Sequence, residues 1–162
     1  MVKKILYLSL PILIMLVIFS FSHQPYQEQD IKPSMNEYLP LEYIEPLVEP
    51  IDITYMNKPV NVETHGVDGV VEFLIRKTAH FGIFFALMAA TVLALHKVFE
   101  FKFSKVLLLS LVITVGYAAL DEFHQSFTPN RTPYVGDVVL DSMGAVTAGF
   151  MIYTVFFWKR RK

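Results

Sequence analysis

Four long apolar runs constrain this chain more than any other feature. They cover residues 5–21, 73–95, 106–120 and 138–158. A helix needs about 20 mostly apolar residues to cross a bilayer, and the short third run reaches that length if its helix continues toward His124. We therefore predict an all-α integral membrane protein, a four-transmembrane-helix bundle with helices at about residues 5–22, 73–96, 105–124 and 137–158.

The basic residues predict how these helices are oriented. Nine of the 14 lysines and arginines flank the runs on one side of the predicted bundle: Lys3, Lys4, Lys97, Lys102, Lys105, Lys159, Arg160, Arg161 and Lys162. The positive-inside rule places such flanks in the cytoplasm. We expect a multi-pass protein of the cell membrane with both termini cytoplasmic.

The segment between the first two helices, at about residues 23–72, is strongly acidic. It carries ten carboxylates against two lysines, which marks it as an acidic extracytoplasmic loop. Six prolines argue against long helices there, but residues 34–37 have the spacing of a helix capping box. Alternating residues at 51–55 and 60–63 predict a β-hairpin.

Composition narrows the class of protein further. The chain has no cysteine, which excludes disulfides, thiolate metal sites and cysteine nucleophiles. A length of 162 residues fits a single membrane domain over 1–162, and with a net charge of -1 we expect the lipid bilayer, not nucleic acid, as partner. An alternative for the N-terminus is a cleaved signal peptide ending near Ser22, which sequencing of the mature protein would distinguish.

Polar clusters lie at the helix ends opposite the basic flanks. Charges near hydrocarbon are costly, and they usually mark a site, a pathway or a structural ion pair. The candidate site residues are Gln24, Arg76, Lys77, His80, Asp121, Glu122, His124, Gln125, Arg131, Asp137 and Asp141. The structural alternative is that the basic members contact headgroups or pair with Asp121 and Asp137 to hold the bundle together.

Helical spacing groups several of these residues. Asp121, His124 and Gln125 share one face, so Asp121 is placed to fix the tautomer of His124, while Glu122 points elsewhere. An Asp121–His124 pair at a water-exposed helix end is the simpler interpretation.

The turn and the last helix carry the remaining candidates. Two prolines bracket Asn130, which tolerates a left-handed conformation, and hold Arg131 on a short, stiff turn. Asp137 and Asp141 lie on one stripe with Gly144, so we expect the last helix to press against its neighbours with its aspartates turned inward.

In this order the motifs resemble the VanZ-like membrane proteins. The matching segments are Ser22 to Gln24, Arg76 to Phe81, Asp121 to Arg131 and Asp137 to Ala145. Asn130 stands where that family commonly has glycine. The resemblance implies a bacterial polytopic membrane protein of a family named for a member linked to resistance to the glycopeptide teicoplanin, and it implies no particular reaction.

Two functions of different class stay open. In the first, a non-enzymatic envelope protein binds a lipid-linked cell-wall precursor or a glycopeptide, with Arg76, Lys77 and Arg131 binding its anionic groups. The alternative is an intramembrane metal-dependent hydrolase or transferase acting on an outer-leaflet lipid or cell-wall precursor. Its candidate metal ligands are His80, Asp121, His124 and either Asp137 or Asp141, with Glu122 as general base and no cofactor otherwise assigned.

Overall fold

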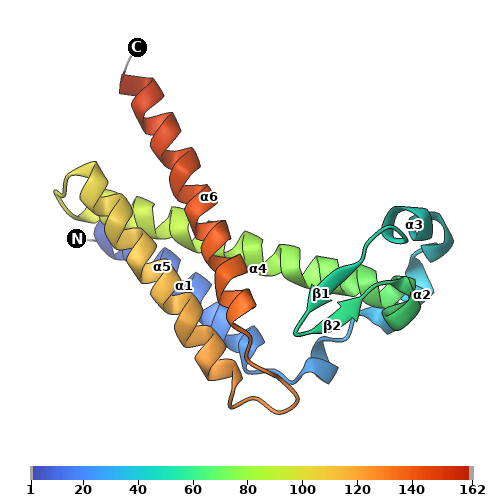
Figure 1. Ribbon diagram of the computed structural model, residues 1–162. Coiled ribbons are helices and arrows are strands. Elements are labelled where there is room, and N and C mark those ends of the chain that lie inside the picture. The colour runs from blue at the N-terminus through green and yellow to red at the C-terminus, as the bar shows by residue number, and fades with distance from the viewer. Residues whose placement is uncertain (1, 161–162) are drawn as a thin grey trace. The chain divides into compact units, whose positions relative to one another are not determined.

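The computed structural model describes residues 2–160, except the side chain of Arg160, and it is dominated by helices (Figure 1). The elements are α1 (Val2–Ser22), η1 (Tyr26–Gln29), α2 (Lys32–Tyr38), α3 (Leu41–Val48), β1 (Ile53–Tyr55), β2 (Lys58–Val60), α4 (Val62–Val98), α5 (Phe103–Gln125) and α6 (Val135–Arg160). The helices α1, α4, α5 and α6 are long and apolar enough to cross a membrane. The predicted all-α membrane fold is confirmed.

The chain divides into two compact units. The first comprises α1, the part of α4 from His80 onward, α5 and α6, and we call it the membrane unit. The second runs from Tyr26 to Ala79, and we call it the loop unit. The boundary lies inside α4, so this helix contributes side chains to both units.

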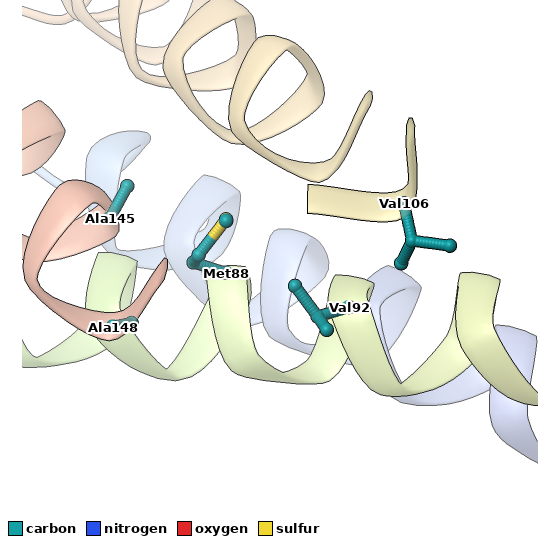
Figure 2. Packing of buried hydrophobic residues seen from close by; sticks show 5 residues of the cluster. All are labelled: Met88, Val92, Val106, Ala145 and Ala148. Atoms are coloured by element: carbon teal, nitrogen blue, oxygen red, sulfur yellow. The ribbon is translucent and has the colours of Figure 1, made fainter. Parts of the chain in front are cut away.

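Two apolar clusters form the core of the membrane unit. In one, Met88 and Val92 of α4 pack with Val106 of α5 and with Ala145 and Ala148 of α6 (Figure 2). Small residues on α6 let the helix backbones approach closely, which is the main way that helices pack inside a bilayer.

The second cluster joins α1 to α4 and α5. Ile18 of α1 packs with Phe84, Leu87 and Ala118. The hydroxyl of Tyr117 in α5 also donates to the carbonyl oxygen of Met15, at 2.6 Å. The C-terminal half of α1 is therefore packed against α4 and α5.

The loop unit contains the predicted hairpin, but its second strand is Lys58–Val60 and not residues 60–63, so the turn is shorter than expected. Ile53 pairs with Val60 and Tyr55 with Lys58, so the strands are antiparallel with a two-residue turn. Met56 and Asn57 in this turn have φ of 51° and 61°, the left-handed geometry of a type I′ hairpin turn. A short helix is present around residues 34–37 as α2, but the predicted capping box is wrong, because α2 begins at Lys32 and its N-cap, Ile31, makes no side-chain hydrogen bond. The helix α3 was not predicted.

The predicted extent of the loop was wrong at its C-terminal end. We expected the helix to begin at residue 73, but α4 begins at Val62. Asn61 caps it, because its side-chain oxygen accepts from the backbone N–H of Thr64 at 3.0 Å.

Gly66 interrupts the helical geometry of α4 with a φ of 71°. The continuous helical part after Gly66, residues 67–98, is about 48 Å long at about 1.5 Å per residue, which exceeds the roughly 30 Å of a bilayer core. Hydropathy detects only the apolar part of such a helix.

Contacts define two ends of the membrane unit. We call the end with the last turns of α1 and α5, the start of α6 and His80 of α4 the polar end. At the opposite, basic end, Lys4 of α1 donates to the carbonyl oxygen of Val98 at the end of α4, at 3.2 Å. Its described lysines are Lys3, Lys4, Lys97, Lys102, Lys105 and Lys159. Arg161 and Lys162, used above to predict the orientation, lie outside the described residues.

Candidate binding site at the polar end

The carboxylate of Asp121 is the centre of a hydrogen-bond network at the polar end. Asp121 lies in the last turns of α5 and is 4% exposed. Its Oδ2 accepts from the Ser22 hydroxyl at 2.8 Å and from Gln125 Nε2 at 3.0 Å. Asp121 and Gln125 therefore act on one helix face, as their spacing predicts, and they bind the end of α1 to the end of α5.

Arg131 extends this network over the end of α1. Its Nη1 donates to Gln125 Oε1, its Nε to the Gln24 carbonyl and its Nη2 to the Phe21 carbonyl, each at 3.1 Å. The last carbonyls of a helix lack intrahelical partners and carry partial negative charge, so a cation stabilises them. Asn130 has a φ of 60°, the left-handed conformation that lets the turn present Arg131 here.

Glu122 points to a different partner from Asp121. It accepts a short hydrogen bond from the backbone N–H of Tyr134, the residue before α6. The Tyr134 carbonyl in turn accepts from the N–H of Asp137 at 2.8 Å. Glu122 is buried, at 7% exposed. It accepts this hydrogen bond beside the N-terminus of α6, which is the positive end of the helix dipole.

A third carboxylate, Asp141, pairs with His80. The distance from His80 Nδ1 to Asp141 Oδ1 is 3.4 Å, and the Asp141 side chain is buried while the His80 side chain is 30% exposed. One turn beyond Asp141, Gly144 lies against the backbone of Phe81. Because only glycine allows this approach, the glycine sets the separation of α4 and α6 beside the pair.

His124 is placed differently from the sequence prediction. Its ring stacks on Phe19 with centroids 4.4 Å apart, and His23 lies 5.6 Å away. Within the described residues there is no Asp121–His124 hydrogen bond, so the expected control of the tautomer by Asp121 is wrong. His124 Nε2 and Asp121 Oδ1 are both buried and have no hydrogen-bond partner in that part of the chain.

Arg76 belongs to the loop unit. It forms an ion pair with Glu72 at 2.8 Å, donates to Gln29 and lies 4.5 Å from the Tyr26 ring centroid. Tyr26 donates to the other oxygen of Glu72 at 2.8 Å. Partial burial, and then the hydrogen bond to Glu72, raise the pKa of Tyr26 to about 12.

Lys77 likewise contacts loop-unit residues. Its ammonium donates to the Tyr55 hydroxyl at 2.9 Å and lies 4.1 Å from the Tyr55 ring centroid. The sequence suggested Asp121 or Asp137 as partners for Arg76 and Lys77. It did not identify Glu72, because the predicted helix began at residue 73, whereas in α4 Glu72 lies four residues before Arg76 on the same helix. It did not identify Tyr26 or Tyr55 either, since nothing in a loop sequence shows which turn folds back on the helix.

Within residues 2–160, the predicted metal ligands are not gathered into one group. Across residues 2–160, no three His, Asp or Glu side chains are arranged to share an ion. The candidates His80, Asp121, His124 and Asp141 are separated into different contacts, with Asp141 on His80 and Asp121 on Ser22 and Gln125. Sequence spacing put them at one end of the bundle, but spacing within each helix does not fix how the helices rotate toward one another.

Comparison with known proteins gives one positive result. A family model described as VanZ/LLP1 matches residues 7–157, a range that includes all the residues described above at the polar end. The curated proteins and the solved structures gave no match.

Proposed function

This chain belongs to the VanZ/LLP1 family of membrane proteins, and we propose that its polar end binds a lipid-linked cell-wall precursor or a glycopeptide such as teicoplanin at the outer surface of the cell membrane. The protein would then contribute to glycopeptide resistance by binding, without catalysing a reaction. The outward placement follows from the lysines at the opposite end, which the positive-inside rule assigns to the cytoplasm.

The observation that carries this proposal is the pair of unpartnered atoms on the last turns of α5. A buried polar atom without a hydrogen bond costs about 1–3 kcal/mol, so it is retained where a ligand or solvent supplies the partner. Asp121 Oδ1 accepts hydrogen bonds, and His124 Nε2 accepts or donates depending on its tautomer. Both ligand classes present several hydroxyl and amide groups that match these atoms, and because both atoms are buried, binding requires neighbouring side chains to move aside.

The role of Arg131 changes in this proposal. Its residue type suggested that it binds an anionic group of the ligand, but three of its nitrogens donate to Gln125 and to carbonyl oxygens at the end of α1. We therefore assign Arg131 to positioning the network and give ligand contact to Asp121 and His124.

The test is ligand binding by the purified protein in lipid nanodiscs. The probes are a polyprenyl-diphosphate-linked disaccharide peptide and, separately, teicoplanin. In His124→Phe the ring still stacks on Phe19 but Nε2 is lost, and we expect binding of at least one probe to fall about tenfold, as for loss of a buried hydrogen bond. His23→Phe changes the neighbouring, exposed ring and serves as the matched control. Equal affinity of the wild type and His124→Phe for both probes would contradict the proposal.

The enzyme alternative is favoured by one observation, the contact between His80 and Asp141. A carboxylate that orients an imidazole is a common arrangement for general-base chemistry. Incubation with the same precursor distinguishes the two functions: cleavage that stops in His80→Gln would support an enzyme, and binding without cleavage supports the binding protein. A stoichiometric metal that is lost in His124→Ala would support the metal-dependent form.

A further inference from the structure

An apolar groove lies at the basic end of the membrane unit, away from the proposed ligand site. It is bounded by the last turns of α4, the start of α5 and the C-terminal half of α6, and its volume is about 550 Å³. Its walls include Ala89, Val92, Phe103, Val155 and Phe156.

The sequence of α6 explains why the groove opens there. Near Gly144 and Gly149 the helix lies close to α4, and a Cβ atom at Gly149 would be 3.1 Å from the Met88 methyl group. Beyond Gly149 the residues facing α4 are large, among them Ile152 and Phe156. In this region α6 diverges from α4 toward its C-terminal end (Figure 1).

Three aromatic side chains line the groove beside Lys159. Phe103 of α5 stacks on Phe156 of α6 with ring centroids 3.6 Å apart. His96 of α4 meets both rings edge-on, at 5.9 Å and 6.4 Å. The imidazole of His96 is thereby held at the mouth of the groove, on an exposed helix turn.

The mouth of the groove is cationic. Lys159 lines it together with His96. Lys97 and Lys102 lie in the neighbouring helix end and turn, and Glu100 is the one carboxylate in the connection from α4 to α5. An apolar groove that ends in positive charge is complementary to a molecule with a hydrocarbon chain and an anionic headgroup.

We propose that this groove binds an anionic phospholipid, with an acyl chain along Ala89, Val92 and Val155 and the phosphate beside Lys159 and His96. A zwitterionic lipid supplies the same chain but gains little from the lysine, since its headgroup carries no net charge. The proposal depends on the α4–α6 groove alone, and it stands whether or not the polar end binds a cell-wall ligand.

The test is lipid retention by the full-length protein. The protein is reconstituted into bilayers of equal parts phosphatidylglycerol and phosphatidylcholine with identical acyl chains and is then purified from them. The lipids that stay bound are counted by native mass spectrometry. We expect phosphatidylglycerol to be retained preferentially. Lys159→Gln should lower that preference about fivefold, as expected for one lysine beside an anionic headgroup. Lys58→Gln in the loop unit makes the same charge change and should leave the preference as in the wild type.

A second pair of variants tests the groove itself. Ala89→Phe places a ring in the groove and should abolish retention of both lipids, whereas Val112→Phe on the exposed face of α5 should not. Equal retention of the two lipids by the wild type would overturn the proposal, as would unchanged retention in Lys159→Gln. A wild-type dimer that Ala89→Phe converts to a monomer would also overturn it, because the groove would then hold a second copy of the chain.

Discussion

Gly144 of α6 lies directly against the main chain of α4, where a Cβ atom would overlap the carbonyl oxygen of Phe81. The residue before Phe81 is His80, and Asp141 precedes Gly144 by almost one helical turn. The close approach of the two backbones therefore sets the 3.4 Å separation between His80 Nδ1 and Asp141 Oδ1. A packing contact and a polar contact are thus determined by the same glycine.

Substitution of this glycine should destabilise the membrane unit. In Gly144→Ala the added methyl group meets backbone atoms, which cannot rotate away, so we expect a loss of about 1–3 kcal/mol in the free energy of unfolding. Unfolding in mixed detergent micelles measures this change. Gly116→Ala is the matched control, because no atom lies within 4 Å of a Cβ built at Gly116. Equal unfolding midpoints for the two variants would show that α6 shifts without cost.

Arg131 should not be replaceable by lysine. Its guanidinium reaches Phe21 O, Gln24 O and Gln125 Oε1 from three different nitrogens, which a single ammonium group cannot reproduce. We expect Arg131→Lys to lose about 2 kcal/mol of stability, in the range for hydrogen bonds to a charged group. Backbone amide hydrogen exchange should rise selectively at the end of α1. Lys97→Arg, on the exposed end of α4, provides the control, and unchanged exchange near Gln24 in Arg131→Lys would refute the capping role.

The His80–Asp141 contact should show a coupling energy in a double-mutant cycle. Removing His80 leaves the buried Asp141 carboxylate without its partner, whereas removing both side chains avoids that penalty. We expect His80→Phe with Asp141→Leu to be more stable than the sum of the single changes predicts, by about 0.5–3 kcal/mol. Strictly additive stabilities would show that the 3.4 Å contact has no energetic role.

The fold was largely predictable because lipid imposes a strong rule. A segment that crosses a bilayer must satisfy its own backbone hydrogen bonds and must be apolar over about 20 residues, so four runs gave four helices. Local signals also sufficed for the hairpin, where Asn57 accepts a positive φ. The start of α4 was missed because residues 62–72 interrupt their valines with charged residues and two glycines, and hydropathy carries no information about a helix that continues beyond the membrane.

The candidate site was predictable in its location but less in its contacts. Helical spacing grouped Asp121 with Gln125, and the structure joins them at 3.0 Å. The same spacing suggested an Asp121–His124 pair, but the imidazole instead turns to Phe19 on α1. Which residue a side chain meets across a helix interface depends on how the helices rotate and approach, and that is decided by packing at positions such as Gly144.

The ionisation of Tyr26 should report the docking of η1 on α4 in the loop unit. Partial burial and the hydrogen bond to Glu72 raise its pKa from 10.0 to about 12 in the folded protein. The folded state therefore holds the proton more tightly, so this contact contributes fully to stability below about pH 10 and loses its contribution as the pH rises through 12. Subtracting the tyrosinate absorbance titration of Tyr26→Phe from that of the wild type should isolate this late step. In Glu72→Gln the step should move toward pH 10, because the negative charge that opposes tyrosinate is gone, whereas Glu63→Gln should leave it in place. A step near pH 10 in the wild type would show that Tyr26 is not held against Glu72.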